Sequence, residues 1–265
     1  MAIRFQHRPG LVAYITCGDP DVNTSKEIVL AAIGAGADVI ELGVPFSDPV
    51  ADGPVIQRAS ERALKSGTRL EHVLEIARAA RSRSDAGLIV FSYLNPLLRF
   101  GMARFCAAAE DAGVDGALIT DLPVEEAEAG GYLRMMRARN LATIFLAAPT
   151  STPKRLKRIA ADSTGFVYAV SRTGVTGVQK ELPQDARELV ARIRRLTDLP
   201  IAVGFGISTA KQFAAVGEYA EAAVVGSALM QVVEANPDSP ARAVAQLITE
   251  LKNAARSGSP VACAR

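Results

Sequence analysis

The chain has 265 residues, of which 49% are hydrophobic and 22% charged, and its formal net charge is +2. This composition is sufficient for one large core, and the basic residues are dispersed rather than gathered into the run that grips a phosphate backbone. The sequence therefore favours one globular domain and argues against nucleic acid as a partner.

Short apolar runs alternate with longer helical patterns along the whole chain, which is typical of repeated β-α units and a parallel sheet. The predicted strands are Leu11–Thr16, Asp38–Leu42, Leu88–Tyr93, Gly116–Thr120, Ala142–Ala147, Phe166–Val170, Ile201–Val203 and Ala222–Val225. The predicted helices are Asn23–Ala35, Val55–Arg81, Ala103–Ala112, Glu125–Arg139, Pro153–Ala161, Asp185–Leu196, Thr209–Val216 and Ala241–Ala255. Residues 256–265 are expected to form a flexible tail.

This alternation fits either a closed (β/α)8 barrel or an open doubly wound sheet. No GxGxxG motif opens the first unit, whereas glycines cluster after the seventh and eighth strands, where barrels commonly bind phosphate. We therefore expect a single (β/α)8 TIM barrel over residues 1–265. Gly36, Gly113 and Gly217 are expected to end helices in the left-handed conformation, and Thr152 followed by Pro153 is expected to begin one.

The cysteines and the apolar segments indicate the compartment. Cys17, Cys106 and Cys263 are odd in number and lack metal-ligand spacing, which is typical of a reducing environment. No apolar leader and no run of about 18 apolar residues is present. We expect a cytoplasmic protein that makes no membrane contact, with Cys17 as a small buried residue.

Carboxylates follow the second predicted strand, where a barrel places its active site. Glu41 ends this strand, and Asp48 and Asp52 lie in the Pro- and Gly-rich loop that follows. Burial at a strand end would raise the pKa of a carboxylate, as an acid/base catalyst near neutral pH requires. The alternatives are a salt bridge at the rim for Glu41, turn stabilisation for the two aspartates, and a metal site, which no His spacing supports.

Glycine-rich segments follow the strands on the other side of the predicted barrel. VGFGIST (Val203–Thr209) and VVGSAL (Val224–Leu229) offer backbone N–H groups and a helix start at Ser227, a combination that binds phosphate, although tight turns would use the same residues. SRTGVTG (Ser171–Gly177), continuing to Leu182, indicates a loop that closes over a ligand, although an ordinary exposed loop could have the same composition.

The chain resembles the tryptophan synthase alpha subunit family over nearly its whole length. The resemblance rests on AYITCGDPD (Ala13–Asp21), ELGVPFSDPVADGPVIQRA (Glu41–Ala59), FSYLNPLLRFG (Phe91–Gly101), GVDGALITDLPVEEA (Gly113–Ala127), FLAAPTSTPKRLKRIA (Phe145–Ala160), YAVSRTGVTG (Tyr168–Gly177), PIAVGFGIS (Pro200–Ser208) and VVGSAL. It implies retro-aldol cleavage of indole-3-glycerol phosphate to indole and glyceraldehyde 3-phosphate, a step of tryptophan biosynthesis.

The resemblance also implies roles for single residues. Glu41 would be the acid/base carboxylate, and Asp52 would accept a hydrogen bond from the indole N–H. The substrate pocket would contain Tyr14, Phe91, Leu118, Tyr168 and Thr176, the last of which would contact Asp52 when the loop closes. Phosphate would bind at Gly177, Phe205, Gly206, Gly226 and Ser227, mostly through backbone N–H groups.

The family works as an alpha2beta2 tetramer with a pyridoxal-phosphate beta subunit, so the resemblance implies no cofactor on this chain. From the residue spacing we also expect no metal. The loop Pro45–Pro54 would dock the partner, with Pro45 and Asp48 as contacts. A short helix usually closes the barrel floor in this family, whereas only about ten residues precede the first strand here. Two alternatives stay open: a stand-alone indole-3-glycerol phosphate lyase, and a non-catalytic barrel that binds a phosphorylated ligand.

Overall fold

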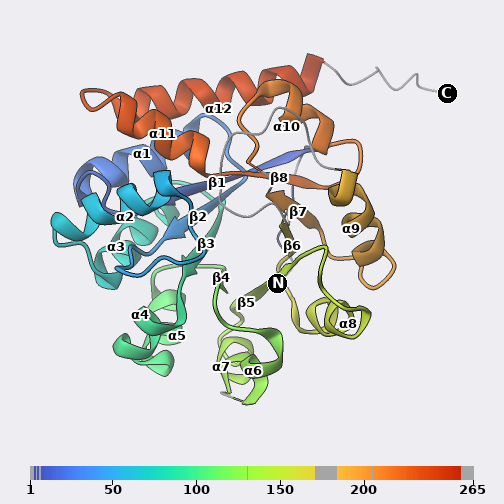
Figure 1. Cartoon of the computed structure of the whole chain (residues 1–265). Helices are drawn as coiled ribbons and strands as arrows, with labels where there is room; N and C mark the ends of the chain where they lie inside the picture. The colour runs from blue at the N-terminus through green and yellow to red at the C-terminus, as the bar shows by residue number, and fades with distance from the viewer. Residues whose placement is uncertain are drawn as a thin grey trace.

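Eight parallel strands close into a barrel in the computed structural model, which describes residues 3, 5, 7–129, 131–170, 184–204 and 206–257. Each strand pairs with its neighbours in chain order, and β8 closes the ring on β1 through register pairs such as Val12 with Val224. Figure 1 shows the helices surrounding these strands. The strands are β1 (Gly10–Thr16), β2 (Val39–Gly43), β3 (Gly87–Ser92), β4 (Gly116–Ile119), β5 (Ala142–Ala147), β6 (Val167–Val170), β7 (Ile201–Gly204) and β8 (Ala222–Val225).

The predicted (β/α)8 barrel is therefore confirmed, and each predicted strand lies within about one residue of its observed bounds. The helices are α1 (Val22–Gly34), α2 (Pro54–Lys65), α3 (Leu70–Arg81), α4 (Leu94–Phe100), α5 (Met102–Asp111), α6 (Val124–Ala129), α7 (Tyr132–Arg137), α8 (Pro153–Asp162), α9 (Gln184–Arg194), α10 (Ala210–Val216), α11 (Ser227–Ala235) and α12 (Pro240–Ser257). Helix α12 includes residues 256 and 257 of the expected tail, and residues 258–265 lie outside the described part.

Two long helices of the sequence prediction are each divided in the structure. The range predicted as Val55–Arg81 forms α2 and α3. Gly67 adopts φ +82°, a left-handed conformation that ends α2. The range predicted as Glu125–Arg139 forms α6 and α7, with Gly131 at φ +71° between them. A left-handed glycine inside a helical pattern thus interrupts a helix that the apolar period alone would continue.

The predicted helix ends are confirmed at three of four positions. Gly36 and Gly113 follow α1 and α5 with positive φ, and the Thr152 hydroxyl accepts the N–H of Arg155 at the start of α8. Gly217 is a correction, because its φ of −59° is right-handed. An added Cβ there would lie 2.5 Å from the Pro9 ring, so close packing is what requires glycine at this position.

The barrel floor is covered by two apolar side chains from the chain's first residues. Ile3 is 9% exposed and packs with Val12 and Val39 in the cluster that fills the barrel. The Phe5 ring meets the Phe166 ring edge to face, with 6.3 Å between centroids. These contacts bury the bottom layer of the barrel, where the short N-terminal segment left closure in question.

A repeated hydrogen bond holds the strands in register at the floor. The bond recurs in the pairs β1/β2, β3/β4, β5/β6 and β7/β8. In each pair, a side chain that precedes the second strand accepts a hydrogen bond from a backbone N–H near the start of the first strand. The pairs are Asp38 with Leu11 (2.7 Å), Asp115 with Leu88 (2.8 Å), Thr164 with Thr143 (2.9 Å) and Glu221 with Ile201 (2.9 Å). Each of the three carboxylates also pairs with a base, respectively Lys252, Arg81 and Arg194. Because one slip of register would break these bonds, they favour a single strand alignment.

Candidate active site

Glu41 lies within the barrel, near the carboxyl end of β2. Side chains alternate along a strand, so Glu41 faces the same side as Val39, which belongs to the cluster that fills the barrel. Its side chain is 0% exposed, and neither carboxylate oxygen has a hydrogen-bond partner among the described residues. Burial raises the pKa of Glu41 to about 8, so this carboxyl carries a proton at neutral pH.

Asp52 lies in the loop between β2 and α2 and is held from two sides. The Tyr93 hydroxyl donates to Asp52 Oδ2 at 3.1 Å and accepts the N–H of Ala51 at 2.9 Å. Gln57, in the first turn of α2, donates from Nε2 to the carbonyl oxygen of Asp52 at 2.8 Å. Burial raises the pKa of Asp52 to about 6, against the opposing effect of the Tyr93 hydrogen bond. At neutral pH Asp52 is therefore mostly ionised.

Two tyrosines, Tyr14 buried and Tyr168 half-buried, share the electrostatic field of these carboxyls. Burial raises the pKa of Tyr14 and of Tyr168, and negative charge on Asp52 and Glu41 raises both further. The Tyr14 ring meets the Phe91 ring edge to face, with 5.0 Å between centroids. The structure thus brings both predicted catalytic residues together with three predicted pocket residues, and both phenols stay neutral near neutral pH.

Leu118, predicted to line the substrate pocket, is fully buried inside the barrel. It is 0% exposed, packs in the cluster that fills the barrel and pairs in register with Phe91. A role in contacting the substrate stays a prediction for Leu118.

Two strand glycines, neither of them named among the predicted site residues, leave room for the tyrosines. A Cβ on Gly43 would lie 2.5 Å from the Tyr14 hydroxyl, and one on Gly204 would lie 2.5 Å from the Tyr168 hydroxyl. Both distances are far below van der Waals contact. Only glycine at these positions allows the phenol rings to keep their present places.

The predicted phosphate residues fall partly on the same mouth of the barrel. Gly226 and Ser227 form the start of α11, and a Cβ on Gly226 would lie 3.4 Å from Cβ of Tyr14. Gly206 has φ +67°, which suits a glycine turn. Phe205, Gly177 and Thr176 lie outside the described residues, as does the whole predicted lid, Ser171 to Leu182.

The loop predicted to dock a partner is exposed over only part of its length. Pro45 is buried, whereas Asp48 is exposed and accepts a hydrogen bond from the Ser47 hydroxyl at 2.5 Å. Val50 is 87% exposed, the highest value among the exposed large hydrophobic residues of the described segments. Phe46 packs on Tyr93 with 5.1 Å between centroids, so this loop touches the residue that holds Asp52.

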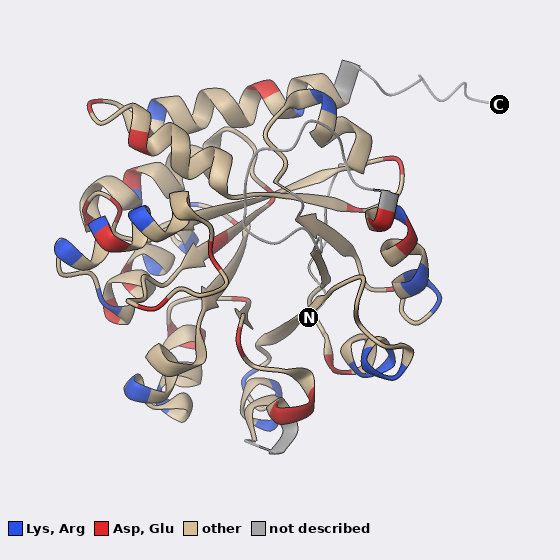
Figure 2. Ribbon diagram, viewed as in Figure 1, with Lys and Arg blue, Asp and Glu red and all other residues tan. Residues whose placement is uncertain are grey.

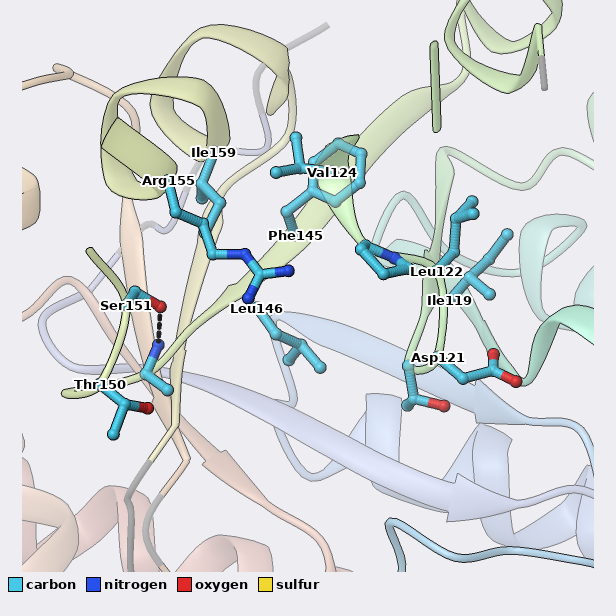
Figure 3. A pocket seen from close by; sticks show the side chains of 13 residues that line it. Ile119, Asp121, Leu122, Val124, Phe145, Leu146, Thr150, Ser151, Arg155 and Ile159 are labelled. Atoms are coloured by element: carbon cyan, nitrogen blue, oxygen red, sulfur yellow. Dashed lines mark hydrogen bonds between the residues drawn. The ribbon is translucent and has the colours of Figure 1, made fainter. Parts of the chain in front are cut away.

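A cavity of about 250 Å³ lies between the loops that follow β4 and β5 (Figure 3). Its lining includes Arg155 of α8, apolar side chains such as Phe145 and Leu146, and Asp121 of the β4 loop, whose carboxylate accepts the Leu94 N–H. Leu146 pairs in register with Tyr168, so the cavity adjoins the barrel mouth. The sequence did not indicate it, because its walls come from two loops about 25 residues apart.

In the described part of the chain, neither metal-ligating side chains nor Cys17 form a second candidate active site. No group of three or more His, Cys, Asp or Glu side chains there is placed to hold a metal ion. Cys17 is buried, and burial raises the pKa of its thiol, which keeps it protonated. Figure 2 shows basic and acidic residues interspersed over the outer helices in this view. None of the described helices is long and apolar enough to cross a membrane.

Comparison with known proteins identifies what this chain resembles. A family model described as "Tryptophan synthase alpha chain" matches residues 1–258. The tryptophan synthase alpha chain of Solibacter usitatus (strain Ellin6076) is 53% identical over 90% of this chain and 89% of that protein. That of Caulobacter sp. (strain K31) is 48% identical over 88% and 85%.

Solved structures agree with the sequence matches. A chain of Mycobacterium tuberculosis tryptophan synthase superposes with a TM-score of 0.87 at 38% identity, covering 94% of this chain and 93% of that chain. A chain of the tryptophan synthase complex from Pyrococcus furiosus gives 0.86 at 36% identity, covering 93% and 98%.

Proposed function

The chain belongs to the tryptophan synthase alpha chain family, and from that membership we propose that Glu41 and Asp52 are its two catalytic carboxyl groups. The reaction of this enzyme is the lyase cleavage of indole-3-glycerol phosphate to indole and glyceraldehyde 3-phosphate. The observation that carries the assignment is Glu41, a fully buried carboxyl without a hydrogen-bond partner among the described residues and with a pKa raised to about 8. A buried ionisable group without a partner destabilises a fold, so a role in chemistry explains its presence.

Glu41 moves the proton in the proposed reaction. Its protonated carboxyl donates to C3 of the indole ring, which gives the indolenine tautomer with positive charge at nitrogen. The resulting carboxylate then removes the proton from the glycerol hydroxyl next to the bond that breaks. The carbonyl of glyceraldehyde 3-phosphate forms, the electrons of the broken C–C bond return to the ring, and Glu41 ends protonated as it began.

Asp52 stabilises the charge that develops on the indole. As a carboxylate it accepts a hydrogen bond from the indole N–H, and this bond strengthens when the ring nitrogen becomes positive. The pKa of Asp52, raised to about 6, leaves it ionised at pH 7 while Glu41 remains protonated. The two carboxyls thus take opposite protonation states in one pocket, as acid and charge stabiliser require.

The phosphate end of the substrate is assigned to the glycine-rich side of the mouth. Backbone N–H groups at Gly206 and Gly226, and the Ser227 hydroxyl at the start of α11, favour an anion there. Gly177 and Phe205, also proposed for this role, and Thr176, proposed to contact Asp52, lie outside the described residues. Tyr14 and Tyr168 would contact the substrate between the two ends.

The partner is proposed to be a beta subunit that carries pyridoxal phosphate, in an alpha2beta2 tetramer. The solved Pyrococcus furiosus structure is named as a tryptophan synthase complex. On this chain, exposed Val50 and Asp48 lie in the loop that carries Asp52, so docking there would act directly on the catalytic loop. No cofactor is proposed for this chain, and the cytoplasmic location stays a prediction from the cysteine pattern.

Release of indole from indole-3-glycerol phosphate by the purified chain, with and without a beta subunit, tests this function. We expect slow release alone and a strong rise with the partner. Fast release at a rate that the partner does not change would indicate a stand-alone lyase. No release in either condition would indicate a non-catalytic phosphate-binding barrel. Intact Glu41 and Asp52 favour the first outcome.

A further inference from the structure

A network of ion pairs joins three segments behind the proposed active site. Asp19, in the loop after β1, is 0% exposed and accepts two bonds from Arg62 of α2, at 2.7 Å from Nε and 2.9 Å from the guanidinium NH2. The other NH group of Arg62 donates to Glu234 of α11 at 2.7 Å. Arg58, one turn earlier on α2, donates to both oxygens of Glu234 at 2.8 and 2.7 Å. Glu234 therefore receives three charged hydrogen bonds from α2.

The electrostatics of the network agree with this geometry. Hydrogen bonds and charge from Arg58 and Arg62 lower the pKa of Glu234 to about 2. Burial raises the pKa of Asp19, and the bonds from Arg62 oppose that rise. Arg62 thus supports a buried carboxylate on one side and a partly exposed one on the other, which fixes the position of its guanidinium plane.

The two helices joined by this network carry opposite ends of the proposed site. Helix α2 begins two residues after Asp52, and Gln57 in its first turn binds the Asp52 carbonyl. Helix α11 begins at Ser227, in the proposed phosphate site, and the Met230 sulfur accepts the buried N–H of Thr16 at 3.4 Å. A shift of α2 against α11 would therefore change the distance between Asp52 and the phosphate position.

This spacing matters for a substrate that spans it. A ligand that binds at two points gains from the linkage only if both points are correctly spaced. Two separate fragments, by contrast, bind each half of the site whatever the spacing.

We propose that Glu234, with Arg62 and Asp19, positions Asp52 relative to the phosphate-binding start of α11. Glu234 is a positioning residue and touches no reacting atom. The inference rests on the proposed function, because that function places the phosphate at α11 and the indole at Asp52.

The test compares Glu234→Ala with Glu110→Ala. Glu110 is the matched control: it is also the next-to-last residue of its helix, and it pairs with Arg139 at 2.6 Å on the outer surface. We expect Glu234→Ala to lower kcat/KM for indole-3-glycerol phosphate by about tenfold, because the reacting groups lose alignment. Its affinities for inorganic phosphate and for indole, measured separately by calorimetry, should stay within about twofold of the unchanged protein.

Each other outcome has a definite meaning. An unchanged kcat/KM in Glu234→Ala, with an active unchanged protein, would overturn the positioning role and leave the proposed function intact. Fragment affinities that fall as much as kcat/KM would show local disruption in place of lost spacing, which also overturns it. An unchanged protein that releases no indole would remove the proposed function itself. Arg62→Lys keeps the charge near Asp19 and serves as a second variant, with an expected smaller loss of kcat/KM.

Discussion

At the scale of single residues, Glu41 and Asp52 differ in their hydrogen-bond partners and therefore in their pKa values. Glu41 is enclosed by the barrel without a hydrogen-bond partner among the described residues, whereas Asp52 accepts a bond from Tyr93. Their pKa values accordingly lie near 8 and near 6. The proposed chemistry requires Glu41 protonated and Asp52 ionised.

These two values predict a bell-shaped dependence of kcat/KM on pH. Activity should fall as pH rises through about 8, where Glu41 loses its proton, and should fall as pH decreases through about 6, where Asp52 gains one. Initial rates of indole release at low substrate concentration from pH 5 to 9.5 measure both limbs. A flat profile across this range would contradict the assigned protonation states.

Tyr93→Phe should move only the acidic limb of that profile. The Tyr93 hydroxyl lowers the pKa of Asp52 by donating to the carboxylate, so its removal raises that pKa. The midpoint of the acidic limb should therefore shift to higher pH, while the basic limb stays in place. Tyr132→Phe, a buried tyrosine whose hydroxyl bonds Ala117 at 3.4 Å on another part of the barrel, is the control and should shift neither limb.

Glu41 should also make the fold less stable at high pH. Its folded pKa lies above the ordinary value of 4.5, so the folded state binds more protons than the unfolded state between about 4.5 and 8. The contribution of Glu41 to stability is therefore lost as pH rises through this window. Urea unfolding should show Glu41→Gln gaining stability over the unchanged protein, by a few kcal/mol more at pH 9 than at pH 5. A gain that is equal at both pH values would show that Glu41 is not buried as an acid.

The sequence indicated Glu41 and Asp52 because carboxylates at a strand end stand out against apolar neighbours. Tyr93, Gly43 and Gly204 did not stand out, since their roles depend on contacts with residues distant in the chain or on the neighbouring strand. Tyr93 reaches Asp52 across 41 positions, and a Cβ on Gly43 would collide with the Tyr14 ring. Such roles follow from packing and carry no local signal.

At the scale of elements, local chemistry identified the strands better than the helices. Each strand is a short buried run that the apolar pattern marks directly. Helix α4 was missed because the carboxylate that accepts the N–H of its first residue comes from elsewhere, namely Asp121 Oδ1 to the Leu94 N–H at 2.7 Å. The break at Gly67 was missed because the apolar period continues through it from α2 into α3.

The carboxylates at the barrel floor should stabilise the fold without affecting the reaction. Asp115 accepts the N–H of Leu88 at 2.8 Å and pairs with Arg81 at 2.6 Å, so Asp115→Ala removes both bonds. The Leu88 N–H then loses this acceptor, whereas Arg81 keeps its bonds to the carbonyl oxygens of Gly113 and Ser84. We expect the free energy of unfolding to fall by about 2–3 kcal/mol, while indole release is unchanged because the site lies at the opposite face. Chemical denaturation and turnover check both statements.

The control for this prediction is Asp111→Ala, which removes an exposed carboxylate from the end of the neighbouring helix α5. Its effect on unfolding should stay within about 0.5 kcal/mol. Equal losses in the two variants would show that the floor hydrogen bonds do not hold the strand pairs.

At the scale of the whole molecule, the alternation of strands and helices left a barrel and an open sheet as alternatives. The pairing that decides between them joins β1 to β8, about 210 residues apart in the chain, and no local pattern reports it. The positions of the glycines after the last two strands favoured the barrel, and closure brings one of them, Gly226, beside Tyr14 of β1. The site is thus a consequence of closure, since its two ends lie on segments that only the closed ring brings together.

A single-turnover comparison of the unchanged protein with Glu41→Gln tests the central claim most directly. Excess enzyme is mixed with indole-3-glycerol phosphate and the formation of indole is followed, while the affinity for this substrate is measured in parallel. The amide keeps the shape of the side chain but cannot carry the proton, so we predict no detectable cleavage with substrate affinity within about tenfold. Appreciable cleavage by Glu41→Gln would contradict the account, because the proton at indole C3 would then come from another group.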